Sequence, residues 1–313
     1  MTGVPVFTGR HVEQAVSPDR AVEAVRDAFV AHARGEWTMP PKVYVTNYPA
    51  GDFRAMPALG NGHALLKWIT SFPGNPLQGL PTVTGVVLVS DAENGQLRAV
   101  LDAASVTALR TGAAAVLAAE TLGRSDAKTA SVIGAGVNGQ AATRTFLARG
   151  RGVSVWDVNE DRARTVAAEL HTDVAASLAE ALAADLVVTV TPGHELLLHN
   201  GVLREGQHVS LMGADGPGKA EASAFELERA HLFCDDWEQA SHGGELAHAV
   251  EAGVVTEDDV TAIGAVLAGT APGRVNEQEI TMFDSTGLAI QDLAIALAAL
   301  ESADELDLPR LEL

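Results

Sequence analysis

The stretch Thr129–Gly139, with the sequence Thr-Ala-Ser-Val-Ile-Gly-Ala-Gly-Val-Asn-Gly, decides the fold of this chain. A run of β-prone residues ends in Gly134, Gly136 and Gly139, and a helix-like stretch, Gln140–Leu147, follows at once. In such a unit the first glycine permits a tight turn, the second lets the backbone approach a pyrophosphate, and the third lets helix pack on strand. The N–H groups that begin the helix can bind phosphate. The pattern predicts a dinucleotide-binding site.

Asp157 ends the next β-prone run of the sequence, Val153–Asp157. An acid at this position can accept hydrogen bonds from both ribose hydroxyls of an adenosine. Its carboxylate also repels a 2′-phosphate, and the following stretch Val158–Glu160 offers no arginine to receive one. We therefore predict NAD rather than NADP as the cofactor.

Downstream of Asp157 short apolar runs alternate with amphipathic stretches. The expected helices are Asn159–Leu170 and Ser177–Ala184, and the expected strands are Leu186–Val190, Gln207–Met212 and, as the last one, His231–Cys234. This alternation predicts an α/β fold with a doubly wound parallel sheet over residues 117–285. The alanine-rich stretch Ala113–Leu122 is expected to be the helix that leads into it.

The first part of the chain, residues 1–116, is different in kind. One early helix is expected at Pro18–Ala33, followed by the β-like runs Lys42–Thr46, Ala64–Thr70 and Val83–Val89. Asp91–Gly95 contains the Asn-Gly pair of a hairpin turn, so these runs predict an antiparallel sheet in an α+β domain. The tail, Gly287–Leu300, is an apolar helix with a wide stripe. We therefore expect residues 286–313 to pack back on this first domain or on a second subunit.

The composition limits the classes of partner and compartment. The chain carries 21 basic and 41 acidic residues, a formal net charge of -20, and such a surface repels nucleic acid and anionic membranes. Cys234 is the single cysteine, so no intrachain disulfide can form, which is typical of a reducing cytoplasm. The N-terminus lacks the pattern of a secretion signal, and the longest apolar runs are strand-sized. The expectation is a cytoplasmic protein with no nucleic-acid or membrane partner.

Two groups of residues could carry chemistry. Lys42, Arg54, Lys67 and Arg110 stand in or beside β-like stretches, and together they could bind a carboxylate; each could also be a solvated charge or a surface ion pair. Asp215 follows a strand directly, in the stretch Gly213–Lys219, and ligands of doubly wound sheets bind beyond the carboxyl ends of strands. The alternative for Asp215 is a helix-capping role in a turn.

Other side chains are weaker candidates. Thr189 and Thr191 could line the cofactor cleft by the same rule, or could be ordinary strand residues. The histidines show no metal spacing, so no metal site is predicted; those considered are His63, His194, His199, His242 and His248. Cys234 stands within an apolar strand, which favours a place in the core over a nucleophilic role.

The motifs together resemble the ornithine cyclodeaminase / μ-crystallin family over nearly the whole chain. The segments that carry the resemblance are Met56–Pro57, Lys67 with Phe72–Pro76 and Gly79–Thr82, Thr107–Thr111, Gly134–Gly136, Gly213–Lys219, Gly244–Leu246 and Ile280–Asp292. The resemblance implies a Rossmann NAD-binding domain and a substrate domain whose sheet joins that of a second subunit. It therefore implies a homodimer.

The resemblance also implies roles for single residues. Lys67 matches the substrate-side acid/base and Asp215 the second catalytic group. Arg110 matches an arginine between substrate and cofactor, while Lys42 and Thr82 match substrate contacts. The predicted cofactor contacts are Arg110, Gly134, Gly136, Val137, Asn138, Gly139, Asp157, Thr191, Gly213, Ala214, Lys219 and Ser285. Many relatives carry glutamine in place of Asn138, and cyclodeaminases commonly carry arginine in place of Lys42.

Arg54 bears most directly on the substrate. Cyclodeaminases that resemble this chain carry glutamate there, which suits a substrate with a distal ammonium group, whereas an arginine favours a carboxylate. Phe53–Pro57 resembles the alanine dehydrogenase branch. The leading prediction is an NAD-dependent oxidoreductase that converts L-alanine, NAD and water to pyruvate, ammonium and NADH. The alternatives are a ketimine reductase acting on a cyclic imine, an opine-type dehydrogenase, an ornithine cyclodeaminase forming proline, and a μ-crystallin-like nucleotide-binding protein with little catalysis.

Overall fold

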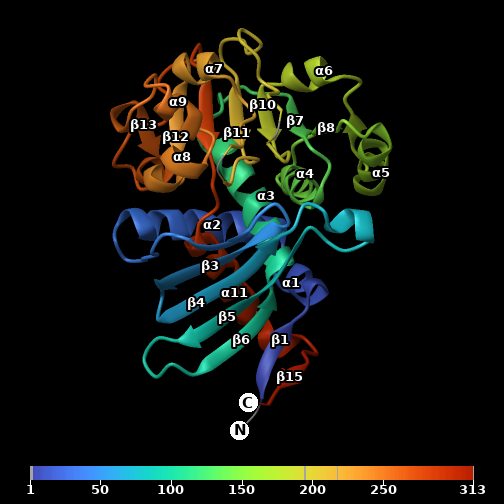
Figure 1. Cartoon of the computed structure of the whole chain (residues 1–313), viewed down its shortest axis with the longest axis vertical. Coiled ribbons are helices and arrows are strands. Elements are labelled where there is room, and N and C mark those ends of the chain that lie inside the picture. The colour runs from blue at the N-terminus through green and yellow to red at the C-terminus, as the bar shows by residue number, and fades with distance from the viewer. Residues whose placement is uncertain (1–2, 194, 217, 313) are drawn as a thin grey trace. The chain divides into compact units, whose positions relative to one another are not determined.

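A computed structural model describes residues 3–193, 195–216 and 218–312 of the chain. The chain divides into two compact units. The first holds the residues up to Arg110 together with those from Leu288 on, and the second runs from Thr111 to Gly287 (Figure 1). The first division falls inside helix α3 (Ala103–Leu122), which is longer than the expected stretch Ala113–Leu122. We call the two parts the mixed-sheet unit and the parallel-sheet unit.

The mixed-sheet unit is built on a seven-stranded sheet of order β15-β1-β6-β5-β4-β3-β2. Its strands are β1 (Val4–Phe7), β2 (Val43–Asn47), β3 (Gly51–Gly60), β4 (His63–Ser71), β5 (Val83–Asp91), β6 (Leu97–Asp102) and β15 (Arg310–Leu311). The predicted antiparallel pairing holds from β2 to β6, whereas β1 runs parallel to β6. A parallel pair needs a long crossover, which short-range turn signals cannot reveal.

Helices cover one face of this sheet. They are α1 (Gly9–Ala15), α2 (Pro18–Ala33) and α11 (Ala289–Glu301), with the 3-10 turns η1 (Asn75–Gln78) and η3 (Ala303–Glu305). Helix α11 packs on β3, β4 and β5 and also against α2. Strand β4 shows the consequence, because Leu65, Lys67 and Ile69 are buried while the alternate residues Leu66 and Trp68 are exposed. One face of the sheet therefore holds the core of the unit and the other is apolar but uncovered.

The parallel-sheet unit has eight strands in the order β13-β12-β14-β11-β10-β7-β8-β9. They are β7 (Ala130–Ile133), β8 (Ser154–Trp156), β9 (Asp173–Val174), β10 (Leu186–Thr189), β11 (His208–Leu211), β12 (His231–Cys234), β13 (Val260–Ala262) and β14 (Thr281–Asp284). All neighbouring strands pair in parallel. The predicted doubly wound α/β sheet is confirmed. The expectation that His231–Cys234 is its last strand is wrong, because β13 and β14 follow it along the chain, and β14 lies between β11 and β12 in the sheet.

Helices connect these strands. They are α4 (Val137–Ala148), α5 (Glu160–Leu170), α6 (Leu178–Leu182), α7 (Ala224–Glu228), α8 (Trp237–Gly243), α9 (Ala247–Glu251) and α10 (Ile263–Leu267), with the 3-10 turn η2 (Glu257–Asp259). The central strands β7, β10, β11 and β14 are buried along their whole length, as in a sheet covered on both faces. Within the described ranges, every helix is too short or too polar to cross a lipid bilayer.

Candidate functional site

Three glycines shape the turn between β7 and α4, each for its own steric reason. Gly134 has a φ of +108°, a backbone conformation that side chains rarely allow. A Cβ atom at Gly139 would overlap the carbonyl oxygen of Gly134, so the helix could not approach the strand so closely. Gly136 faces open space, where an added Cβ would meet no atom of the protein. Its lack of a side chain therefore leaves room for a ligand.

The start of α4 has the properties of an anion site. Gly136 is its N-cap residue, and within the part of the chain that the structure describes no side chain caps this end and no acid stands in the first turn. The first residues, Val137 and Asn138, therefore keep N–H groups that the helix itself cannot satisfy. Such groups bind phosphate well because the helix dipole adds to them. The turn thus fits the diphosphate of a dinucleotide.

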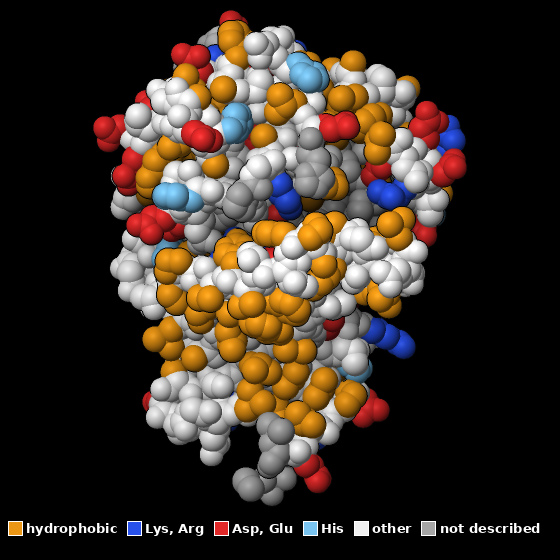
Figure 2. All heavy atoms as spheres, viewed as in Figure 1, with side chains coloured by type: hydrophobic (Ala, Val, Ile, Leu, Met, Phe, Trp, Pro, Cys, Tyr) orange, Lys and Arg blue, Asp and Glu red, His pale blue; other side chains and the backbone are white. Residues whose placement is uncertain are grey.

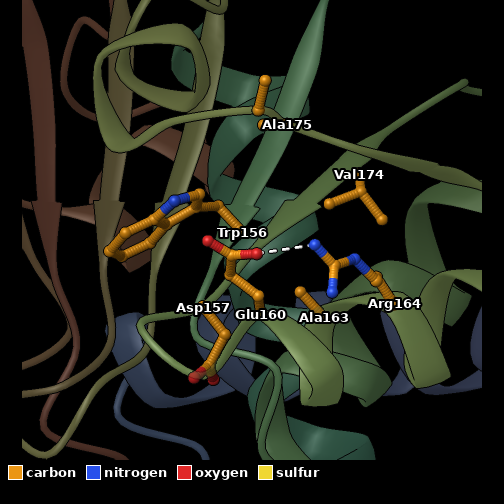
Figure 3. Close-up of a pocket in the computed structure, with 8 residues that line it drawn as sticks. Trp156, Asp157, Glu160, Ala163, Arg164, Val174 and Ala175 are labelled. Carbon is orange, nitrogen blue, oxygen red and sulfur yellow. Dashed lines mark hydrogen bonds and ion pairs between the residues drawn. The ribbon is translucent and has the colours of Figure 1, made fainter.

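Asp157 follows β8 and is buried, with 6% of its surface exposed. Its Oδ2 atom accepts a hydrogen bond of 2.8 Å from the amide of Ala135, and Oδ1 accepts one of 2.8 Å from the amide of Asn159. The carboxylate therefore links the glycine turn to the loop after β8. Asp157 and Trp156 line a cavity of about 230 Å³ together with residues of α5 and the β9 region. Figure 3 shows the Asp157 side chain pointing away from the indole of Trp156.

Arg162, on the first turn of α5, lies beside this carboxylate. Its Nη1 atom is 3.4 Å from Oδ2 of Asp157, and its side chain is half exposed. Val158–Glu160 contains no arginine, as the sequence shows, but Arg162 stands two residues beyond that stretch. One helical turn brings a residue this far along the chain back toward the strand end. The neighbourhood of Asp157 therefore includes an arginine that the sequence did not reveal.

Glu221 ties together the carboxyl ends of β10 and β11. It is fully buried and accepts hydrogen bonds from the hydroxyl of Thr189 (2.6 Å), the amide and hydroxyl of Thr191 (2.9 and 2.6 Å), and the amide of Gly213 (3.1 Å). A Cβ atom at Gly213 would collide with this carboxyl group. Thr191 and Gly213, both predicted cofactor contacts, are therefore held in place by an acid that sequence reasoning missed.

Glu245 lies directly beside Glu221. Its carboxylate accepts the amides of Glu221 (2.8 Å) and Ala222 (2.6 Å). Burial raises the pKa of Glu221, and burial together with the charge of Glu221 raises the pKa of Glu245 well above its usual range. By accepting the amides of Gly213, Glu221 and Ala222, these two acids fix the backbone of the loop that follows β11.

That loop carries Asp215 and Lys219. Ala214, before Asp215, is buried, and the Nζ atom of Lys219 lies 2.5 Å from Oδ1 of Asp215. Pro217, between them, lies outside the described residues. The loop therefore presents a carboxylate and an ammonium together, both partly exposed, just beyond the carboxyl end of β11.

Ser285, a further predicted cofactor contact, is buried after β14. Its hydroxyl donates to Oδ2 of Asp235 at 3.1 Å, and the same oxygen accepts the amide of Gly287 at 2.8 Å. Through Asp235, the Ser285 side chain therefore helps to fix the backbone near Gly287, where the parallel-sheet unit ends. Asp235 is another buried acid that the sequence did not reveal.

In the mixed-sheet unit Lys67 lies at the centre of a buried charge cluster. Its Nζ atom is 2.9 Å from Oδ1 of Asp292 on α11, and both side chains are almost fully buried. Arg110 approaches the same oxygen, with Nε at 3.7 Å. In the sequence, Asp292 stands out only as the last residue of the family motif Ile280–Asp292, and it is not among the predicted site residues. A signal was present, because Asp292 is an acid within the apolar stretch Gly287–Leu300, and an acid that is buried with such a stretch calls for a partner.

The surroundings of Lys67 set its protonation. The pKa of Lys67 is lowered from 10.5 to about 8, mainly by burial and also by the charges of Arg110 and Lys42. The charge of Asp292 and its hydrogen bond with Lys67 oppose this change. A lysine with a pKa near 8 can both accept and donate a proton close to neutral pH. Three of the four predicted cations therefore interact.

Arg54, the fourth cation, is held by a different acid. Its Nε atom lies 2.6 Å from Oδ1 of Asp52 and its guanidinium group stacks 5.4 Å from the ring centroid of Tyr44. It shares a strand face with Met56, which stands opposite Lys67. Thr82, the remaining predicted substrate contact, lies just before β5, where its carbonyl oxygen accepts the amide of Phe72.

Among the described residues no cluster of three or more His, Cys, Asp or Glu side chains is arranged to hold a metal ion. His194 lies outside the described residues. Cys234 is buried, and burial raises the pKa of its thiol, which makes it a core residue.

Comparison with known proteins agrees with these features. Residues 5–306 match the model of the ornithine cyclodeaminase/mu-crystallin family. The chain belongs to this family. This chain is 42% identical to the alanine dehydrogenase of Archaeoglobus fulgidus over 306 residues. The alignment covers 95% of this chain and 94% of the relative.

Two solved structures share the fold of this family member. An archaeal alanine dehydrogenase dimer with bound NAD has a TM-score of 0.93 at 40% identity and covers 99% of both chains. The Thermococcus litoralis Δ1-pyrroline-2-carboxylate reductase, in complex with NADH and L-proline, has a TM-score of 0.92 at 26% identity. It covers 99% of this chain and 100% of its own. The resemblance seen in the sequence is confirmed.

Proposed function

We propose that the protein is an NAD-dependent dehydrogenase that oxidatively deaminates a small L-amino acid, with L-alanine as substrate. The products are pyruvate, ammonium and NADH. The observation that carries this proposal is Lys67, a fully buried lysine with a pKa of about 8, held between Asp292 and Arg110. The 42% identical alanine dehydrogenase supports the same substrate class.

The glycine turn and the open start of α4 are proposed to hold the diphosphate of NAD, with Asp157 on the adenosine ribose. Bound NAD would accept the hydride from Cα of the substrate. Lys42, Arg54 and Arg110 are proposed to bind the substrate carboxylate, because cations on rigid elements orient such a group well. This orientation would leave the Cα–H bond free to react.

Lys67 is proposed to move the protons of the reaction. As the neutral amine it takes a proton from the substrate nitrogen, which frees the lone pair that drives hydride loss. Water then adds to the resulting substrate iminium, and Lys67 returns its proton to the departing ammonia. Asp215 is proposed to order that water or to take its proton. Its ion pair with Lys219 would hold it in place.

The direct test is NADH absorbance with the purified protein, NAD and a panel of L-amino acids that includes ornithine. Accumulation of NADH with alanine or another small monoamino acid is expected. Ammonia release from ornithine without net NADH would replace the proposal with a cyclodeaminase. Activity with no amino acid, but with a cyclic imine and NADH, would replace it with an imine reductase.

The imine reductase is the second candidate because of the similarity to the pyrroline-2-carboxylate reductase. The cyclodeaminase is less favoured, since the guanidinium of Arg54 would repel a distal ammonium group. Replacing Arg54 by glutamine removes this repulsion and leaves the Asp52 carboxylate, which contacts Arg54 at 2.6 Å, without that cation. Alanine turnover should therefore weaken, and the exclusion of diamino substrates should relax.

The adenosine end of the site is proposed to favour NAD over NADP. The carboxylate of Asp157 repels a 2′-phosphate, while Arg162 beside it would attract one. Replacing Arg162 by alanine should weaken NADPH binding more than NADH binding, as measured by the fluorescence of each nucleotide. An equal effect on both would overturn the role of Arg162. Equal affinity of the unchanged protein for both nucleotides would contradict the preference itself.

A homodimer is proposed to form through the uncovered face of the mixed sheet. Figure 2 shows hydrophobic side chains gathered over the strands of this unit. Exposed on that face are Val43, Val45, Leu66, Trp68 and Val86 from three strands, and Phe53 stacks on Trp68. A contiguous apolar patch of this kind marks a protein interface, and the archaeal alanine dehydrogenase is a dimer. Trp68→Asp should yield monomers in light scattering, whereas Val275→Asp on the other unit should not.

A further inference from the structure

The buried contact between Lys67 and Asp292 joins residues from β4 and α11. Lys67 is 1% exposed and Asp292 is fully buried, so water cannot solvate either charge. Removing one partner from such a pair leaves an uncompensated buried charge, which is strongly unfavourable. Yet a lysine that moves protons must lose its own charge in every turnover. The carboxylate therefore needs a second partner at that moment.

Arg110 is placed to be that partner. Its Nε atom lies 3.7 Å from Oδ1 of Asp292, and this nitrogen is buried without a hydrogen-bond partner among the described residues. The other oxygen of Asp292, Oδ2, is also buried and accepts no hydrogen bond from them. A short movement can therefore convert the loose Arg110–Asp292 contact into a hydrogen-bonded one. Buried polar atoms without partners call for such an explanation.

We propose that Asp292 is the positioning residue of Lys67: it anchors the charged lysine and stays paired with Arg110 when the lysine is neutral. Lys67 can then alternate between its two forms without leaving its place on β4. The proposal rests on the proposed role of Lys67 as the acid/base. It adds a residue that touches neither substrate nor cofactor but controls the group that does.

The charges that face Lys67 give the proposal a measurable sign. Asp292 on α11 raises the pKa of Lys67, whereas burial and the charges of Arg110 on α3 and Lys42 before β2 lower it. On β3, Arg54 and Asp52 are paired with each other. Asp292→Asn keeps the shape and an acceptor but removes the negative charge. The pH midpoint of kcat/KM should therefore move to lower pH.

The first experiment is that pH profile, measured on the full-length protein with whichever substrate it turns over. Asp292→Asn should lower kcat by about tenfold or more and shift the midpoint downward, because the lysine loses both its anchor and its counter-charge. Gln291→Ala is the matched control, since Gln291 is equally buried on the same helix and only caps its start. It should lower Tm and leave the midpoint unchanged. An unshifted midpoint in Asp292→Asn would overturn the proposal.

A second experiment needs no activity at all. Thermal unfolding is compared for the wild type, Lys67→Met, Asp292→Asn and the double variant. If Asp292 serves Lys67, Asp292→Asn lowers Tm more in the wild type than in Lys67→Met, where the carboxylate keeps Arg110 as its partner but no longer anchors a lysine. Equal changes in both backgrounds would mean that Asp292 only supports packing. This coupling is independent of substrate, so an error in the proposed reaction and an error about Asp292 give different results.

Discussion

Both units bury carboxylates, but they surround them differently. In the mixed-sheet unit, Asp292 has cations as neighbours, Lys67 at 2.9 Å and Arg110 at 3.7 Å. In the parallel-sheet unit, Glu221 and Glu245 lie beside each other and are held by backbone amides and threonine hydroxyls. In the proposed reaction, the first arrangement supplies a lysine that exchanges a proton with the substrate. The second holds a shape, because N–H and hydroxyl donors fix the carboxyl groups without supplying a mobile charge.

This difference separates two kinds of functional dependence. Where buried side chains carry the charge, substitution should remove the reaction and leave the nucleotide site intact. Where glycines and backbone amides form the site, substitution should change binding through the geometry of the backbone. Variants in each unit can therefore sharpen the contrast or break it.

The largest effect is expected at Lys67. Lys67→Met removes the group proposed to take and return the proton of the substrate nitrogen, so kcat should fall by about 10²–10⁴-fold, the usual contribution of general acid–base catalysis. NADH binding, measured by fluorescence, should be retained because the glycine turn is untouched. Lys128→Met changes an exposed lysine of the other unit and serves as the control. Near-full activity of Lys67→Met would mean that the buried charges of the mixed-sheet unit do not carry the reaction, and the contrast with the parallel-sheet unit would be lost.

The next effect is expected at the glycine turn. Gly139→Ala would place a Cβ against the carbonyl oxygen of Gly134, so both stability and NADH affinity should fall, the affinity by about 100-fold for a loss of a few kcal/mol. Gly136→Ala meets no protein atom, so Tm should stay the same while NADH binding weakens. Unfolding curves and nucleotide titrations of both variants check this. Unchanged affinity in Gly136→Ala would mean that the diphosphate does not approach this residue.

The glycine turn was also the part that the sequence predicted best, for a physical reason. Gly134, Gly136 and Gly139 act within one strand–turn–helix unit, so their spacing along the chain is their spacing in the fold. Lys67 and Arg110 stood out as cations in rigid stretches. Their common partner Asp292 did not, because the contact spans 225 positions of the chain.

Long-range assembly explains the other omissions. Strand β14 (Thr281–Asp284) was not predicted as a strand, and it joins the sheet between β11 and β12, which lie far from it along the chain. Glu221 and Glu245 look like surface acids in the sequence, and only the packed loops enclose them. Arg162 was missed at shorter range, where one turn of α5 returns it to Asp157.

A smaller effect is expected from Lys42. Its charge adds to the burial that lowers the pKa of Lys67 to about 8, so Lys42→Met should raise that pKa. The neutral amine is the active form in oxidation, and kcat/KM should therefore rise with pH through about 8 in the wild type and through a higher pH in the variant. The measurement is the pH dependence of kcat/KM at constant ionic strength. A midpoint that does not move would mean that Lys42 acts only on the substrate.

The smallest effect is expected at Glu245, where only stability should change. Its pKa is raised well above the ordinary value of 4.5, so the folded protein holds a proton that the unfolded chain releases, and the free energy of unfolding falls as pH rises above 4.5. Glu245→Gln cannot ionise and keeps an oxygen for the amides of Glu221 and Ala222. Its stability relative to the wild type should therefore improve between pH 5 and pH 8, by up to about 2 kcal/mol.

Urea unfolding at the two pH values measures this change, and any constant cost of the amide group cancels between them. Glu228→Gln, on the exposed side of α7, provides the surface control. If Glu245→Gln differed from the wild type equally at both pH values, Glu245 would be ionised throughout. The carboxyl groups of the parallel-sheet unit would then tolerate full charge without a cation. That result would break the contrast with Asp292, because amide donors alone would suffice where the mixed-sheet unit uses Lys67 and Arg110.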